Sequence, residues 1–144
     1  MVYESDQTGK KPLANSKLVR FNGIREDGHE TFYFDRVQEV ADYLDDKTMA
    51  FGFCKTAQKP YDCYVTACLI WAKMVFGSDV RISSDGEIAD WQAGKEIVEK
   101  ALGLNELVIT ENDGSFSVKT KMEGYKSDGS ESSFEPRKEI PVKF

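Results

Sequence analysis

The sequence predicts an α+β fold with a mixed β-sheet and about three helices. Three observations lead to this prediction: β-rich runs with turn signals stand near both ends of the chain, a long apolar helical pattern fills the middle, and short strand-like runs flank that helix. The chain has 144 residues, of which 40% are hydrophobic, so it is long enough to bury a core of its own.

Composition divides the chain into one apolar-rich region and two polar ends. Residues 1–16 contain few apolar anchors and are predicted to form a flexible arm, whereas residues 126–144 are polar and balanced in charge, as expected of a mobile tail. A single globular domain is therefore predicted over residues 17–125.

The first predicted elements are a β-hairpin and an acidic helix. Residues 17–24 alternate in side-chain type, residues 25–28 form a turn sequence that ends in glycine, and residues 29–34 resume a β-rich run. A helix is expected over residues 35–46, because Asp35 suits an N-cap and the apolar residues that follow recur at helical spacing.

A strand-helix-strand unit is predicted in the middle of the chain. Its strands are residues 49–54 and 79–83, and its helix is residues 60–76, which begins with Pro60 and stops before Gly77. The helix has almost no polar face, so it is expected to be buried centrally, between a sheet and another layer or against a partner. Parallel strands in one sheet would make the crossover right-handed.

The last predicted elements are an amphipathic helix and a second hairpin. The helix covers residues 87–102 and is stopped by Gly103. Residues 106–110 and 115–122 form strand patterns on either side of an Asn-Asp-Gly turn, which is a strong signal for a β-hairpin.

The cysteine count and the chain start favour a reduced, cytoplasmic protein. Cys54, Cys63 and Cys68 are odd in number and lie in apolar runs, so they are predicted to be buried thiols. The only histidine, His29, has no motif linking it to Cys54, which leaves a thiol nucleophile without an evident base. The chain start lacks a secretory pattern, and no apolar run reaches the roughly 18 residues of a membrane helix.

The negative charge is concentrated in one segment. Residues 25–46 contain eight acidic residues and two arginines, which account for the whole net charge of −6. This balance disfavours binding to a phosphate backbone and predicts a surface that meets a basic protein partner. No metal site or cofactor is predicted. The candidate interface residues are Glu39, Asp42, Asp45 and Asp46.

A crevice is the alternative functional site. If the two strands of the central unit were parallel neighbours, their carboxyl ends would meet at one edge of the sheet, where open sheets bind ligands. Helix N-termini and lysines at that edge would favour an anion. The same residues also have ordinary roles as turn, cap and solvated loop residues. They are Lys55, Thr56, Lys59, Ser83, Ser84 and Asp85.

A group of motifs within about residues 51–86 resembles small uncharacterised proteins of tailed phages and prophages. The motifs are Lys59-Pro60-Tyr61-Asp62, Val65-Thr66-Ala67, Lys73, Phe76-Gly77 and Ser83-Ser84-Asp85-Gly86. The resemblance implies a cytoplasmic, infection-related setting and no particular activity.

Two functional hypotheses follow. The first is a non-enzymatic protein-binding accessory or host-modulating module that uses the acidic surface. The second is a small anionic-ligand binder or enzyme that uses the crevice. Because the central helix could also be covered by a second copy of the chain, a homo-oligomer is open as well.

Overall fold

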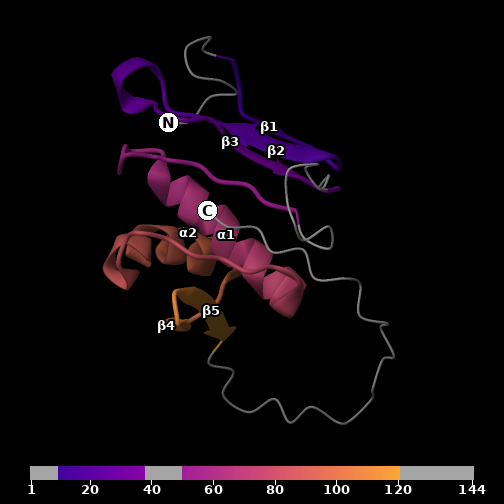
Figure 1. Ribbon diagram of the computed structural model, residues 1–144, viewed down its shortest axis with the longest axis vertical. Helices are drawn as coiled ribbons and strands as arrows, with labels where there is room; N and C mark the ends of the chain where they lie inside the picture. The colour runs from indigo at the N-terminus through magenta and orange to yellow at the C-terminus, as the bar shows by residue number, and fades with distance from the viewer. Residues whose placement is uncertain (1–9, 38–49, 121–144) are drawn as a thin grey trace.

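The computed structural model describes residues 10–37 and 50–120. A three-stranded sheet lies at one end of the molecule, helices α1 (Asp62–Phe76) and α2 (Gln92–Leu102) lie in the middle, and a two-stranded hairpin lies at the other end (Figure 1). The predicted α+β class is therefore confirmed. The predicted mixed sheet is wrong for the described residues, because both sheets are antiparallel, and two helices are found there instead of about three.

The first sheet has the strand order β1-β2-β3 and contains the first predicted hairpin. Its strands are β1 (Leu13–Ala14), β2 (Leu18–Phe21) and β3 (Phe32–Asp35), so β1 lies inside the segment predicted to be an arm. Phe21 pairs with Phe32, and both rings are buried with their centroids 5.0 Å apart. Since side chains alternate along a strand, the neighbouring Tyr33 faces outward.

The connection from β2 to β3 is held by one buried amide. Asn22 is 0% exposed, and its Nδ2 group donates to the His29 carbonyl at 2.9 Å and to Thr31 Oγ1 at 3.1 Å. Its Oδ1 atom accepts from the backbone N–H groups of Gly23 at 2.7 Å and His29 at 3.1 Å. All polar atoms of this side chain are thus paired, as burial requires.

Helix α1 departs from the prediction of a helix buried on every side. One face packs against α2 and β5 and buries Val65, Leu69 and Ile70. The opposite face is exposed, because no layer of the described chain covers it. Its exposed apolar residues are Tyr64, Trp71 and Val75, and Phe76 is exposed at the C-terminal end of the helix.

Helix α2 confirms the helix predicted over residues 87–102. A short 3-10 helix, η3 (Ile88–Trp91), leads into it, and Gly103 closes it with a left-handed φ of 63°. Where α2 crosses α1, Gly94 lies so close to Thr66 that a Cβ atom at position 94 would be 2.2 Å from Thr66 Oγ1. The missing side chain therefore permits this close approach.

The second sheet is the hairpin that the Asn-Asp-Gly signal predicts. It consists of β4 (Leu107–Asn112) and β5 (Ser115–Thr120). Asp113 and Gly114 have φ values of 50° and 70°, which is the sign that a type I′ turn needs at both central residues.

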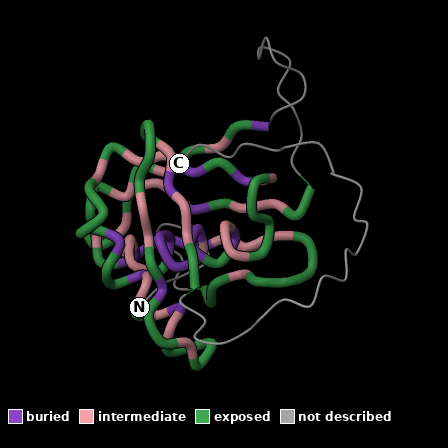
Figure 2. Tube along the Cα trace, turned by 90° about the horizontal axis from the view of Figure 1, so that it is seen from below, coloured by how far each residue is buried: buried purple, intermediate pink, exposed green. Residues whose placement is uncertain are grey.

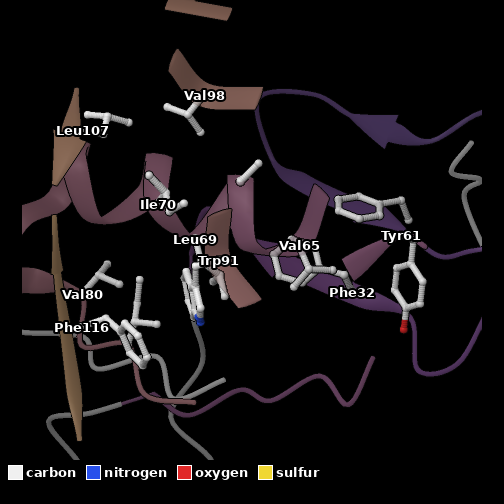
Figure 3. Packing of buried hydrophobic residues seen from close by; sticks show 13 residues of the cluster. Phe32, Tyr61, Val65, Leu69, Ile70, Val80, Trp91, Val98, Leu107 and Phe116 are labelled. Atoms are coloured by element: carbon white, nitrogen blue, oxygen red, sulfur yellow. The ribbon is translucent and has the colours of Figure 1, made fainter. Parts of the chain in front are cut away.

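One apolar cluster joins β2, β3, both helices and the β4–β5 hairpin. It extends from Phe32 and Tyr61 at the first sheet to Trp91 and Phe116 at the second (Figure 3). The rings of Trp91 and Phe116 stack with centroids 4.6 Å apart. Buried positions gather in the helical interior, whereas connecting loops are mostly exposed (Figure 2).

The predicted strand-helix-strand unit is not formed. Residues 50–54 belong to no sheet of the described chain, and within residues 79–83 only Ile82 makes an isolated antiparallel bridge, to Phe116. The parallel crossover is therefore wrong. The acidic helix predicted over residues 35–46 lies outside the described residues except at its start, where Asp35 ends β3.

Candidate functional site

An open groove with a volume of about 1230 Å³ lies beside the first turns of α1. One wall is the segment of residues 50–58, which precedes α1. The other walls are residues 81–86, the η3 region and the β4–β5 turn. The floor includes Val65 and Leu69 of α1. The groove therefore joins apolar surface from the core to polar groups from several loops.

Most residues of the predicted crevice line this groove. Lys55, Thr56, Ser83, Ser84 and Asp85 all border it, whereas Lys59 does not; its backbone N–H donates to the Thr56 carbonyl at 3.1 Å. Parallel strands do not bring these residues together. They meet because the loops on either side of α1 fold over the same end of that helix.

The four acidic residues of the predicted interface lie outside the described part of the chain. Glu39, Asp42, Asp45 and Asp46 belong to residues 38–49, which directly precede the groove wall in the sequence. Their candidate role in binding stays a prediction.

Two exposed aromatic side chains stand on the groove wall. Phe51 is 42% exposed and Phe53 is 61% exposed, and their ring centroids are 6.0 Å apart. The sequence prediction of an interior strand over residues 49–54 missed this exposure. The signal that could have found it is the Phe-Gly-Phe alternation, which places both rings on one side of an extended segment.

The groove wall is fastened to the first hairpin through Glu30. The Glu30 backbone N–H donates to the Lys55 carbonyl at 3.3 Å, and the Lys55 backbone N–H donates to Glu30 Oε2 at 2.7 Å. The Tyr61 hydroxyl and the Cys54 thiol both donate to the Glu30 carbonyl, at 2.6 Å and 3.5 Å. Glu30 thus contacts the segment that leads into α1 at two places, Cys54 with Lys55 and Tyr61.

The Cys54 thiol is held in its protonated form. Burial raises its pKa to about 12, and nearby Glu30 adds to the effect. Burial also raises the pKa of the Tyr61 hydroxyl. The Nδ1 atom of His29 lies 2.6 Å from the Lys55 carbonyl oxygen, so that nitrogen carries the hydrogen in this contact. A thiolate nucleophile needs a lowered pKa and a nearby base. Here the pKa of Cys54 is raised, and Nδ1 of His29 is bonded to a backbone carbonyl.

Two carboxylates of the groove lie at helix starts, and one of them, Asp90, takes part in a cap. The Thr56 hydroxyl donates to Asp62 Oδ1 at the N-terminus of α1. Asp90 Oδ2 accepts from the Glu87 backbone N–H at 2.8 Å in a capping box at η3. Because Asp62 already places a negative charge at the N-terminus of α1, that helix end is less favourable for a second anion.

The two predicted serines differ in their bonding. Ser84 Oγ accepts from the Gly86 backbone N–H at 3.0 Å and so stabilises a local turn. Ser83 Oγ is shielded from solvent and makes no hydrogen bond within residues 10–37 and 50–120. Ser83 therefore offers the groove a buried hydroxyl with free hydrogen-bonding capacity among the described residues.

The charged residues that line the groove give it a net charge of −2. Four aspartates face two cations, which makes the groove more attractive to a cation than to an anion. No group of three or more potential metal ligands occurs among the described residues. The lining charges are Asp62, Asp85, Asp90, Asp113, Lys55 and Arg81.

No known protein family, curated protein or solved structure matches this chain. The resemblance to phage-encoded proteins stays a prediction. Within the part of the chain that the structure describes, neither helix is long and apolar enough to span a lipid bilayer.

Proposed function

We propose that this protein is a non-enzymatic protein-binding module, an accessory or host-modulating factor of the phage type, and that the groove is its binding surface. The observation that carries the proposal is the exposed pair Phe51 and Phe53 on the wall of an open, acidic groove. Aromatic side chains supply much of the binding energy at protein interfaces, and clustered exposed apolar surface marks such interfaces.

The charge distribution supports a basic partner. The groove carries a net charge of −2, and the acidic residues Asp42, Asp45 and Asp46 precede its wall by only a few positions in the sequence. Complementary charge speeds encounter and rejects wrong partners. Aromatic contacts would then provide the affinity, and the carboxylates the selectivity.

A paired substitution tests this function. The double variant Phe51→Ser/Phe53→Ser removes both exposed rings, and Phe76→Ser serves as the matched control, because Phe76 is also exposed but lies outside the groove. Tagged wild-type and variant proteins are used to capture partners from a bacterial lysate, with and without phage infection. A protein partner should be retained by the wild type and the control but lost, by at least about tenfold, from the double variant.

Equal retention of every partner by all three proteins would overturn the proposal that the groove binds proteins. The acidic contribution is measured separately with the triple variant Asp42→Asn/Asp45→Asn/Asp46→Asn. Partner binding by that variant should be weaker at low salt and less sensitive to added salt than binding by the wild type.

One observation favours a second function, the binding of a small anionic ligand. Lys55 and Arg81 line the groove together with the unbonded Ser83 hydroxyl. The four aspartates oppose this function. Titration of the wild type and of Lys55→Ala with phosphate and with small dicarboxylates, followed by thermal unfolding, tests it: a rise in Tm for the wild type alone would support it, and no rise would exclude these ligands.

A further inference from the structure

We propose that the segment Ala50–Cys54 receives an extended, basic and apolar peptide of a partner protein as an added β-strand. This inference rests on the proposed function and names the mode of recognition and the chemistry of the partner.

The segment has the side-chain alternation of a strand. Phe51, Phe53 and Lys55 are exposed, while Gly52 and Cys54 between them are half-buried. A period of two is the period of extended backbone. Figure 1 shows this stretch of chain running beside the first sheet toward the start of α1.

Among the described residues, the backbone of residues 50–53 has none of the partners that a strand has. Within residues 10–37 and 50–120, no backbone hydrogen bond is made by residues 50–53; the attachment to the first hairpin begins only at Cys54 and Lys55. Unpaired N–H and C=O groups on extended backbone are a template for another strand. Strand addition would satisfy them and place the side chains of the peptide beside Phe51 and Phe53.

Charge complementarity selects the occupant. The groove next to this segment carries four aspartates against Lys55 and Arg81. A peptide with lysine or arginine at alternate positions would place cations near these carboxylates while its apolar residues contact the aromatic rings. A second copy of the chain would bring an equally acidic groove to the interface, so like charges disfavour a homodimer at this site.

The test uses synthetic peptides and the full chain. The first peptide alternates valine and lysine, the second alternates valine and glutamate, and the third repeats the first with alternate backbone amides N-methylated. Fluorescence anisotropy measures the affinity of each labelled peptide. We expect the valine-lysine peptide to bind, and both other peptides to bind at least about tenfold more weakly, because strand addition depends on main-chain hydrogen bonds.

Amide hydrogen exchange locates the contact. Addition of the valine-lysine peptide should slow exchange at residues 51–54 and leave the amides of β5 unchanged. The Phe53→Ser variant should lose affinity for the peptide, while the Phe76→Ser variant should keep it. Equal binding of the N-methylated peptide, or no change in exchange at residues 51–54, would overturn strand addition.

The outcomes also separate this inference from the proposed function. If the Phe51→Ser/Phe53→Ser variant loses its captured partner but N-methylation has no effect, the groove binds proteins by side chains alone and strand addition is wrong. Slow amide exchange at residues 51–54 in the free protein would also overturn strand addition. If that exchange rate depends on protein concentration, a second copy covers the segment. If it does not, the chain itself covers the segment.

Discussion

Asn22 shows how one buried polar side chain determines a local structure. It makes four hydrogen bonds across the β2–β3 connection, and none of its polar atoms is left unpaired. The sequence predicts a turn at residues 25–28 but not this role, because an asparagine before a glycine is equally common in exposed turns. Only the fold shows that the amide is buried.

Asn22→Ala should lower the free energy of unfolding by about 2–4 kcal/mol, because it removes four hydrogen bonds and leaves the buried Gly23 N–H and two backbone groups of His29 without these partners. Urea denaturation measures the change. The matched control is Asn15→Ala, since Asn15 also accepts from two backbone N–H groups, those of Lys17 and Leu18, but at an exposed site. The control should cost less than about 1 kcal/mol. Equal losses for the two variants would contradict the role assigned to Asn22.

The partly buried thiols make stability sensitive to alkaline pH. Burial raises the pKa of Cys54 to about 12 and that of Cys68 to about 11, from an unfolded value of 9.0. A raised folded-state pKa means that the unfolded thiol ionises first. The stabilising contribution is therefore complete below pH 9 and is lost as the pH rises from 9 toward 12.

Thermal unfolding from pH 7 to pH 11 checks this expectation. The Tm of the wild type should fall above pH 9, and Cys54→Ala should fall less steeply across the same range. The labelling of Cys54 by a thiol reagent should also be slow at pH 8. Rapid labelling at that pH in the folded protein would contradict the burial of this thiol and reopen its use as a nucleophile.

At the scale of elements, the sequence predicts the positions of helices and hairpins better than it predicts which other elements pack against them. The helix patterns at residues 60–76 and 87–102 and the Asn-Asp-Gly turn predict nearly correct positions, because capping, periodicity and turn geometry are local. Within the described residues α1 is not buried on all sides, because hydrophobicity alone does not determine which layer covers a helix. Trp71 is 48% exposed because α2 occupies only one face of α1.

Gly94→Ala should destabilise the protein by about 1–3 kcal/mol, although alanine favours a helix more than glycine does. The new Cβ would lie 2.2 Å from Thr66 Oγ1 and 2.7 Å from the Ala67 backbone nitrogen, so α1 and α2 would have to separate. Urea denaturation of Gly94→Ala, of Thr66→Ala and of the double variant Thr66→Ala/Gly94→Ala gives the coupling free energy between the two positions. The double variant should recover part of the loss, because the contact with Ala67 persists. A more stable Gly94→Ala protein would contradict the close helix packing.

At the scale of the whole molecule, most of the predicted crevice residues meet in one groove, but not through the predicted parallel strands. Parallel strands were expected to bring together residues 55–59 and 83–85, yet no such sheet is formed. Five of the six predicted residues still line one groove, because both segments flank α1 and fold over its start. The Phe-Gly-Phe alternation predicts that Phe51 and Phe53 share one side of the segment, but long-range packing decides whether that side faces the core or the solvent.

The charge pattern extends beyond the groove. The whole net charge of −6 is accounted for by residues 25–46, and the lining residues of the groove add a further acidic surface. We expect binding of a partner to weaken as salt is raised, because exposed charges are screened over about 10 Å at moderate ionic strength. Isothermal titration at low and moderate salt measures this. Unchanged affinity would show that the aromatic contacts act without charge complementarity.

The central claim is that the groove wall at Phe53 contacts a protein partner. Photo-crosslinking tests it most directly: a photoreactive phenylalanine analogue replaces Phe53 in one protein and Phe76 in another, and each is illuminated in a bacterial lysate. We expect a discrete protein adduct from position 53 that is absent from position 76. The same adducts from both positions, or none from position 53, would contradict it.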